Sequence, residues 1–302
     1  MALRGHLRRL RELLEFGDLP AVDREIEIYG RLADELRQPI YLWLKPFFKS
    51  SRAMLEGRFD DCERLLHESL MIGQRAQDRT AVLFFATNMT MLRGLQGRLQ
   101  EVEPQVKGFV EDYPSIAAWR ASLARIHAEL DWRDQARAEF EELAVRDFAG
   151  FPRDGGWLAS MCLLAQVCAY LHDGRRAVAL YEILLPFAGR NVVLGSCSAF
   201  FGLVSRHLGL LAATMSRWDE ASRHFEDCLA SCRSMRARPI EAHIQYEYGA
   251  MLRARGRPEE RVKADALLDQ AIATATELGM AKIVYDAHLL MRMASRPDLP
   301  QT

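Results

Sequence analysis

The chain has 302 residues, a length that allows one large domain, two ordinary domains or a repeat array. It is 49% hydrophobic and 27% charged, with 19 Gly and 11 Pro, which excludes a disordered, collagen-like or low-complexity chain. Its 40 basic and 41 acidic residues give a net charge of -1, so overall charge predicts no attraction to nucleic acid or anionic membranes.

The N-terminal segment, residues 1–16, places arginines among its leucines and lacks the uninterrupted apolar stretch of a signal peptide. It indicates an amphipathic helix. No apolar run reaches the ~18 to 20 residues of a membrane-spanning helix. The six cysteines are widely spaced, which suits a reducing compartment. We therefore expect a cytoplasmic protein with free thiols.

A short turn phrase recurs along the chain. Gly or a polar residue is followed by polar and acidic residues, and then a small residue opens a run with helical apolar spacing. The copies begin at Gly17, Gly57, Gly97, Asp131, Asp173, Ser216 and Gly256. The residues that open the following helices lie at positions 21, 62, 102, 136, 177, 221 and 264, which is 34 to 44 residues apart. This period accommodates two helices and two turns.

Each copy of the phrase has the chemistry of a turn between two helices. Gly adopts the left-handed conformation at a helix C-terminus, acids stabilise the next helix N-terminus, and a small residue lets helices approach closely. We expect an all-α fold of about seven antiparallel helix pairs starting near residue 3, and a closing helix over residues 281–294. We expect a single domain over 1–296, a disordered tail over 297–302 and almost no strands.

The sixth copy of the repeat resembles the tetratricopeptide family, which places Leu-Gly in the first helix and small and aromatic residues in the second. The matching positions are Leu208, Gly209, Ala221, Phe225 and Cys228, and Tyr248–Gly249 repeats the first pair one period later. The period of about 41 is similar to that of MalT-like repeats in large bacterial LuxR-type regulators and in proteins that fuse an AAA-type ATPase to a class III nucleotidyl cyclase. Residues 177–191, 208–221 and 266–279 carry this likeness. The resemblance implies a right-handed α-solenoid.

Motifs for catalysis or metal binding are weak. Gly155–Gly156 follows no strand and precedes no phosphate-binding Lys, so we interpret it as a loop between repeats. His224, Cys228 and Cys232 share a helix face and could bind a metal, but Cys228 is at a packing position of the repeat. The turn at residues 195–198 is read as a capped helix start and not as a nucleophile. We predict neither an enzyme nor a cofactor.

The resemblance also predicts a binding surface, because the first helices of such repeats line a concave groove. The residues that it directs into the groove are Gln166, Tyr170, Leu203, Arg206, Leu210, Thr214, His243, Tyr246 and Arg253. Arg and Tyr are frequent anchors of protein interfaces. The alternative for each residue is an ordinary solvated position or a contact between repeats.

Three functions follow from these observations. The first is a non-catalytic scaffold or regulatory module in bacterial signalling or transcription, which binds a protein or peptide partner such as an ATPase or cyclase module and is compatible with a homo-oligomer. The second is a sensor whose groove holds a small molecule or short peptide. The third is a helical enzyme with its site in the linkers at residues 146–157 or 188–198, where no catalytic motif is found.

Overall fold

The computed structural model describes residues 2–194 and 199–293, and its fold is all-α with one small sheet. The helices of the N-terminal half are α1 (Ala2–Phe16), α2 (Leu19–Leu36), α3 (Pro39–Leu42), α4 (Leu44–Glu56), α5 (Phe59–Arg75), α6 (Arg79–Gln96), η1 (Leu99–Glu101), α7 (Glu103–Asp112), α8 (Ala117–Glu129) and α9 (Arg133–Leu143). The C-terminal half contains α10 (Trp157–Leu171), α11 (Gly174–Leu184), η2 (Leu185–Phe187), β1 (Asn191–Leu194), β2 (Ala199–Leu203), α12 (Val204–Thr214), α13 (Trp218–Met235), α14 (Arg238–Arg255), η3 (Pro258–Glu260), α15 (Arg261–Leu278) and α16 (Ala281–Met293).

Successive helices pack as pairs over most of the described chain. Direct packing joins α1 to α2, α4 to α5, α8 to α9, α10 to α11, α12 to α13, and α14 to α15. The pair formed by α6 and α7 differs, because η1 lies between them and contacts both. The closing helix is present as α16 and packs on α15. The expected tail, 297–302, lies outside the described residues.

The recurring turn phrase acts as the sequence predicts. Gly57 and Gly97 end α4 and α6 with φ of +83° and +73°, in the left-handed region that glycine adopts readily. Asp131 and Ser216 hold the corresponding left-handed positions in later copies. The side chain of Asp173 accepts a hydrogen bond from the backbone N–H of Arg176 at the start of α11. Local chemistry therefore fixes where these helices end and begin.

The glycines of the tetratricopeptide-like pattern lie where helices approach closely. A Cβ on Gly209 would be 3.0 Å from the ring of Phe225, so the first helix of this pair rests on that ring. A Cβ on Gly249 would be 2.9 Å from Leu268 Cγ and 3.1 Å from the Ala264 carbonyl oxygen. The packing of α12 on α13 and of α14 on α15 thus accounts for glycine at both positions.

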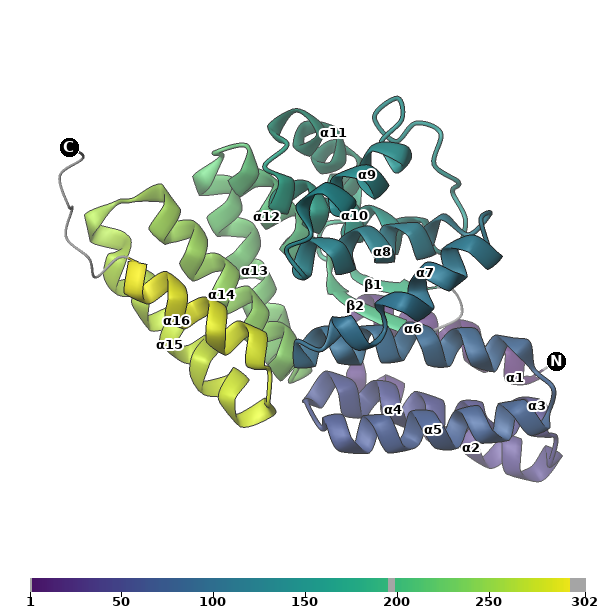
Figure 1. The fold of residues 1–302 in the computed structure, drawn as a ribbon. Coiled ribbons are helices and arrows are strands. Elements are labelled where there is room, and N and C mark those ends of the chain that lie inside the picture. Colours follow the sequence, from purple (N-terminus) through teal and green to yellow (C-terminus); the bar gives the residue numbers. More distant parts are fainter. Residues whose placement is uncertain (1, 195–198, 294–302) are drawn as a thin grey trace.

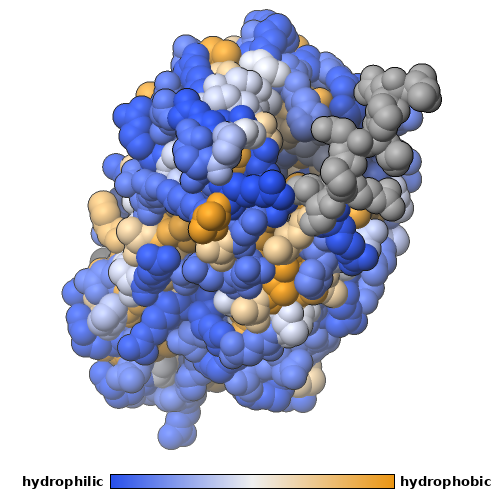
Figure 2. Space-filling model, turned by 90° about the vertical axis from the view of Figure 1, so that its left-hand side faces the viewer, coloured by the Kyte–Doolittle hydropathy of each residue, from blue (hydrophilic) through white to orange (hydrophobic). Residues whose placement is uncertain are grey.

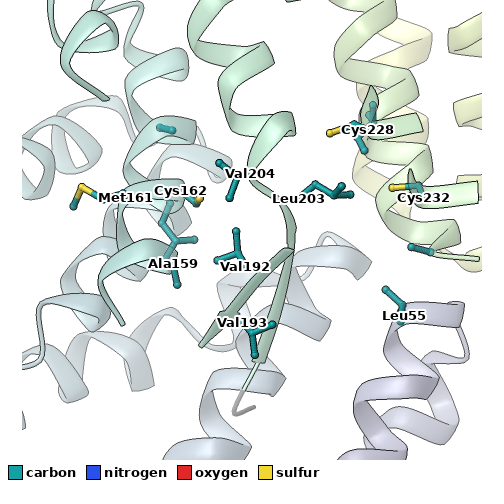
Figure 3. Packing of buried hydrophobic residues seen from close by; sticks show 14 of the residues in the cluster. Leu55, Ala159, Met161, Cys162, Val192, Val193, Leu203, Val204, Cys228 and Cys232 are labelled. Atoms are coloured by element: carbon teal, nitrogen blue, oxygen red, sulfur yellow. The ribbon is translucent and has the colours of Figure 1, made fainter. Parts of the chain in front are cut away.

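One element was not predicted. Strands β1 and β2 form an antiparallel hairpin where the sequence suggested a linker over residues 188–198 that leads into a helix. Val192, Val193 and Leu203 are buried, and Figure 3 shows the hairpin lying between helices that carry Cys162 and Cys228. The run of β-branched and aromatic residues favours strands once the surrounding helices bury both faces. The turn at residues 195–198 lies outside the described residues.

Segments far apart in the sequence meet across the molecule. The Asn191 amide donates a hydrogen bond to the Leu14 carbonyl oxygen at 2.9 Å, and α4 packs against α14. Gly57 lies against Leu278, and Gly97 lies against Lys282 at the start of α16. Figure 1 shows the yellow C-terminal helices beside the ends of α4 and α6. The array of helices therefore closes around its interior.

Among the described residues, no helix combines the length and hydrophobicity needed to cross a membrane.

Candidate functional site

A cavity of about 80 Å³ lies inside the closed array, and it is bordered by the first helices of successive pairs. Helices α4, α6, α8, α10, α12 and α14 contribute to its walls, together with β2. The lining is Ser51, Met54, Leu55, Asn88, Met91, Gly94, Leu95, Arg125, Glu129, Leu163, Gln166, Phe200, Phe201, Arg206, Pro239, Ile240 and His243. The volume corresponds to roughly five to eight water-sized positions, so it suits a small organic molecule.

Three of the residues that sequence reasoning placed in a groove meet at this cavity. Gln166 extends from α10, Arg206 from α12 and His243 from α14. They come from three successive helix pairs. The tetratricopeptide-like spacing therefore identified residues that share one internal surface.

The other predicted residues of α12 do not line the cavity. Leu203 lies at the end of β2 and is buried in the hydrophobic core, because α12 starts one residue later than this position. Thr214 donates its hydroxyl to the Leu210 carbonyl oxygen within the last turn of α12. Both Thr214 and Leu210 are half-buried. These residues stabilise the fold locally.

The remaining predicted residues pair with neighbouring helices. Tyr170 donates its hydroxyl to the carboxylate of Asp131 at 2.6 Å, and Arg253 forms an ion pair with Asp265. Tyr246 is half-buried, and burial raises the pKa of its hydroxyl. Tyr170 and Arg253 thus have partners within the chain.

Two ion pairs dominate the polar side of the cavity. Arg206 donates from Nε and Nη2 to Glu247, at 2.8 and 2.5 Å, in a bidentate contact. Arg125 pairs with Glu129 one turn along α8. Sequence reasoning missed Arg125 and Glu129 because α8 has no Leu-Gly pair to set the register of the fourth repeat.

Two histidines beside this cluster are neutral. His207 accepts a hydrogen bond from the Gln166 amide at 3.2 Å and donates from Nδ1 to the Leu203 carbonyl oxygen at 3.1 Å. Burial lowers the pKa of His207 to about 3, with a smaller contribution from Arg206. His243 faces the cavity, and burial lowers its pKa well below the usual range. Arg206, Arg125 and Lys282 lower the pKa of His243 further.

A second, apolar cavity of about 320 Å³ lies between α6, α8 and the start of α10. Leu163 and Phe201 border both cavities. Gly155 and Gly156 line the second cavity beside Asp154, which accepts a hydrogen bond from the Gly156 N–H. A phosphate cradle needs free backbone N–H groups, and the Asp154 carboxylate already accepts from this one, in keeping with the loop interpretation.

The cysteines of α13 are part of the core. Cys228 and Cys232 are buried, and burial raises the pKa of both thiols. His224 pairs instead with the Tyr181 hydroxyl at 2.9 Å. Within residues 2–194 and 199–293, no group of three potential ligands is placed to hold a metal ion. The packing interpretation of Cys228 is confirmed by its burial.

Comparison of the chain with protein-family models, with curated proteins and with solved structures finds no match.

Proposed function

We propose that the chain is a non-catalytic sensor module, a right-handed tetratricopeptide-like solenoid that binds a small molecule in its central cavity. The observation that carries this proposal is the convergence of Gln166, Arg206 and His243 from three helix pairs on one partly enclosed space. Ligand sites are typically concave, mostly apolar and equipped with a few fixed polar groups. This cavity has that composition.

The closure of the array favours a small ligand over a long peptide. An extended peptide would need an open groove along the first helices, whereas α4 packs on α14 and the β1–β2 hairpin occupies part of the interior. A ligand bound between helix pairs would contact α8, α10, α12 and α14 together. Its binding would stabilise their relative positions, which is the physical basis for a signal.

A protein-binding scaffold in signalling is the second candidate, and the surface at the C-terminal end favours it. Tyr285 and Leu289 of α16 are 66% and 46% exposed, and Val262 of α15 is 80% exposed. Figure 2 views this end of the molecule and shows hydrophobic patches within a largely hydrophilic surface. Exposed apolar groups of this kind can contact a partner protein.

The sensor proposal is tested by a thermal-shift screen of small molecules against the wild-type protein and a variant with a filled cavity. Ser51 lines the cavity, so Ser51→Phe should occupy the space that a ligand needs. A ligand at 100 times its Kd stabilises the folded state by about 2.7 kcal/mol, which raises the Tm by several degrees. We expect such a ligand to stabilise the wild type and to have no effect on Ser51→Phe.

Ser231→Phe is the matched control for this substitution. Ser51 and Ser231 each donate a hydroxyl to the carbonyl oxygen four residues earlier in a helix, but Ser231 lies on the surface of α13. The control should keep the wild-type response. A screen without hits, or a hit that stabilises Ser51→Phe equally, would contradict the sensor proposal. A protein partner bound equally by wild type and Ser51→Phe would favour the outer surface as the recognition site.

A further inference from the structure

The central cavity has walls of two different kinds. Helices α4 and α6 and strand β2 supply apolar groups, and α8, α10, α12 and α14 supply most of the polar ones. The apolar groups include Met54, Met91, Phe200 and Phe201. The polar groups are Arg125, Glu129, Gln166, Arg206 and His243 on the second wall, with Ser51 and Asn88 on the first. A ligand that complements both walls has a polar end and an apolar end.

The guanidinium groups retain donors that the protein does not use. Arg125 donates from Nη1 to Glu129, and its Nε and Nη2 donate no hydrogen bond to a described residue. A Cβ on Gly94 would lie 3.1 Å from Arg125 Nη2, so glycine at this position makes room for the guanidinium beside the cavity. Arg206 uses Nε and Nη2 for Glu247, and its Nη1 is likewise without a partner among the described residues.

The charges around the cavity favour an anion near His243. The carboxylates of Glu129 and Glu247 pair with Arg125 and Arg206. After burial, the positive charges of Arg206, Arg125 and Lys282 each lower the pKa of His243. A positive potential therefore acts where the neutral imidazole faces the cavity. Neutral imidazole can still donate one hydrogen bond to a ligand oxygen.

On the basis of the proposed sensor function, we infer that the ligand is a small organic carboxylate with an apolar part of about five to seven carbons. The carboxylate lies at the polar wall formed by Arg125, Arg206 and His243. Arginine suits this role because its planar fork matches the geometry of a carboxylate. The apolar part lies against Phe200, Phe201 and Met54. The estimated size follows from the roughly five to eight water-sized positions of the cavity.

The inference is tested with pairs of probes that differ in charge and have nearly the same shape. Phenylacetate is compared with phenylacetamide, and hexanoate with hexanamide, by isothermal titration calorimetry on the full chain. We expect at least one carboxylate to bind at least 10-fold more tightly than its amide. Arg125→Gln should reduce carboxylate binding to the level of the amide, because Gln retains a hydrogen bond to Glu129 but carries no charge.

Arg120→Gln is the matched control on the same helix. Arg120 pairs with Glu139 and Glu142 outside the cavity, so this substitution also removes a paired guanidinium from α8. It should leave carboxylate binding unchanged. The comparison of acid and amide on the wild-type protein does not depend on either variant folding correctly.

The outcomes separate this inference from the proposed function. Equal binding of acid and amide, or binding of neutral or cationic screening hits alone, would overturn the carboxylate assignment and leave the sensor function standing. Carboxylate binding that is equally strong in Arg125→Gln would also overturn it. Failure of every compound in the screen and of all four probes would overturn both proposals.

Discussion

His207 makes the stability of the folded chain depend on pH. Its ring is fully buried between Gln166 and the Leu203 carbonyl oxygen, and its pKa is lowered to about 3. In the unfolded chain the pKa of histidine is ~6.5, so the unfolded state binds the extra proton first as the pH falls. The contribution of the neutral, buried His207 to the free energy of unfolding is therefore fully present above pH 6.5, and it decreases progressively toward pH 3.

We expect His207→Gln to weaken this dependence. From pH 7 to pH 5, the neutral burial of His207 should account for about 2 kcal/mol of lost unfolding free energy in the wild type. The variant should lose about 2 kcal/mol less over the same interval, as measured by urea denaturation. His243 also has a lowered pKa, so some dependence should remain. Equal pH dependence in the two proteins would show that His207 does not carry the effect.

At the residue scale, part of the cavity could be predicted from the sequence. Gln166, Arg206 and His243 were found because Leu208–Gly209 and Tyr248–Gly249 set the register of neighbouring first helices. Arg125 was missed because the fourth repeat lacks such a pair, although stepping back one period from Gln166 leads to residue 125. Phe200 and Phe201 could not be found, since they line the cavity from a strand that the repeat pattern does not describe.

At the scale of elements, turn chemistry determines what the sequence reveals. The helix ends at Gly57, Gly97 and Gly256 were predicted because the left-handed conformation at a helix C-terminus strongly favours glycine. The β1–β2 hairpin was not predicted, because Val192, Val193 and Leu203 are buried by distant helices and show no alternation with polar residues. Tertiary burial decides between helix and strand for such an apolar run.

The contribution of close helix packing can be measured by comparing two helical glycines. Gly108 of α7 has nothing within 4 Å of an added Cβ, so Gly108→Ala should stabilise the protein by up to about 1 kcal/mol through helix propensity. Gly249→Ala gains the same helix propensity, but its added methyl group would push α14 away from Leu268 and from the Ala264 carbonyl of α15. Because overpacking costs about 1 to 3 kcal/mol, we expect net destabilisation. Chemical denaturation measures both, and stabilisation by both substitutions would contradict close packing of α14 on α15.

At the scale of the whole molecule, contacts between distant segments close the array of helix pairs around an internal cavity. The contacts that close it join residues more than 170 positions apart, such as Asn191 with Leu14 and Gly97 with Lys282. A closed, compact chain of this length should have a radius of gyration of about 19 Å, and an open array of the same helices would be larger. Small-angle X-ray scattering of the wild-type protein measures this directly.

The closing contact itself can be separated from local turn strain by two matched substitutions. Gly97 and Gly256 both follow a helix with φ of +73°, so leucine at either position carries the ~1 to 2 kcal/mol cost of a left-handed conformation. A Cβ on Gly97 would lie 2.9 Å from Lys282 Cβ and 3.0 Å from its backbone nitrogen, whereas Gly256 has open space. We expect Gly97→Leu to lower the free energy of unfolding more than Gly256→Leu does and to increase the radius of gyration. Equal stability and equal dimensions of the two variants would show that the contact between Gly97 and α16 does not hold the array closed. The cavity would then be maintained by the packing of α4 on α14 and by the β1–β2 hairpin.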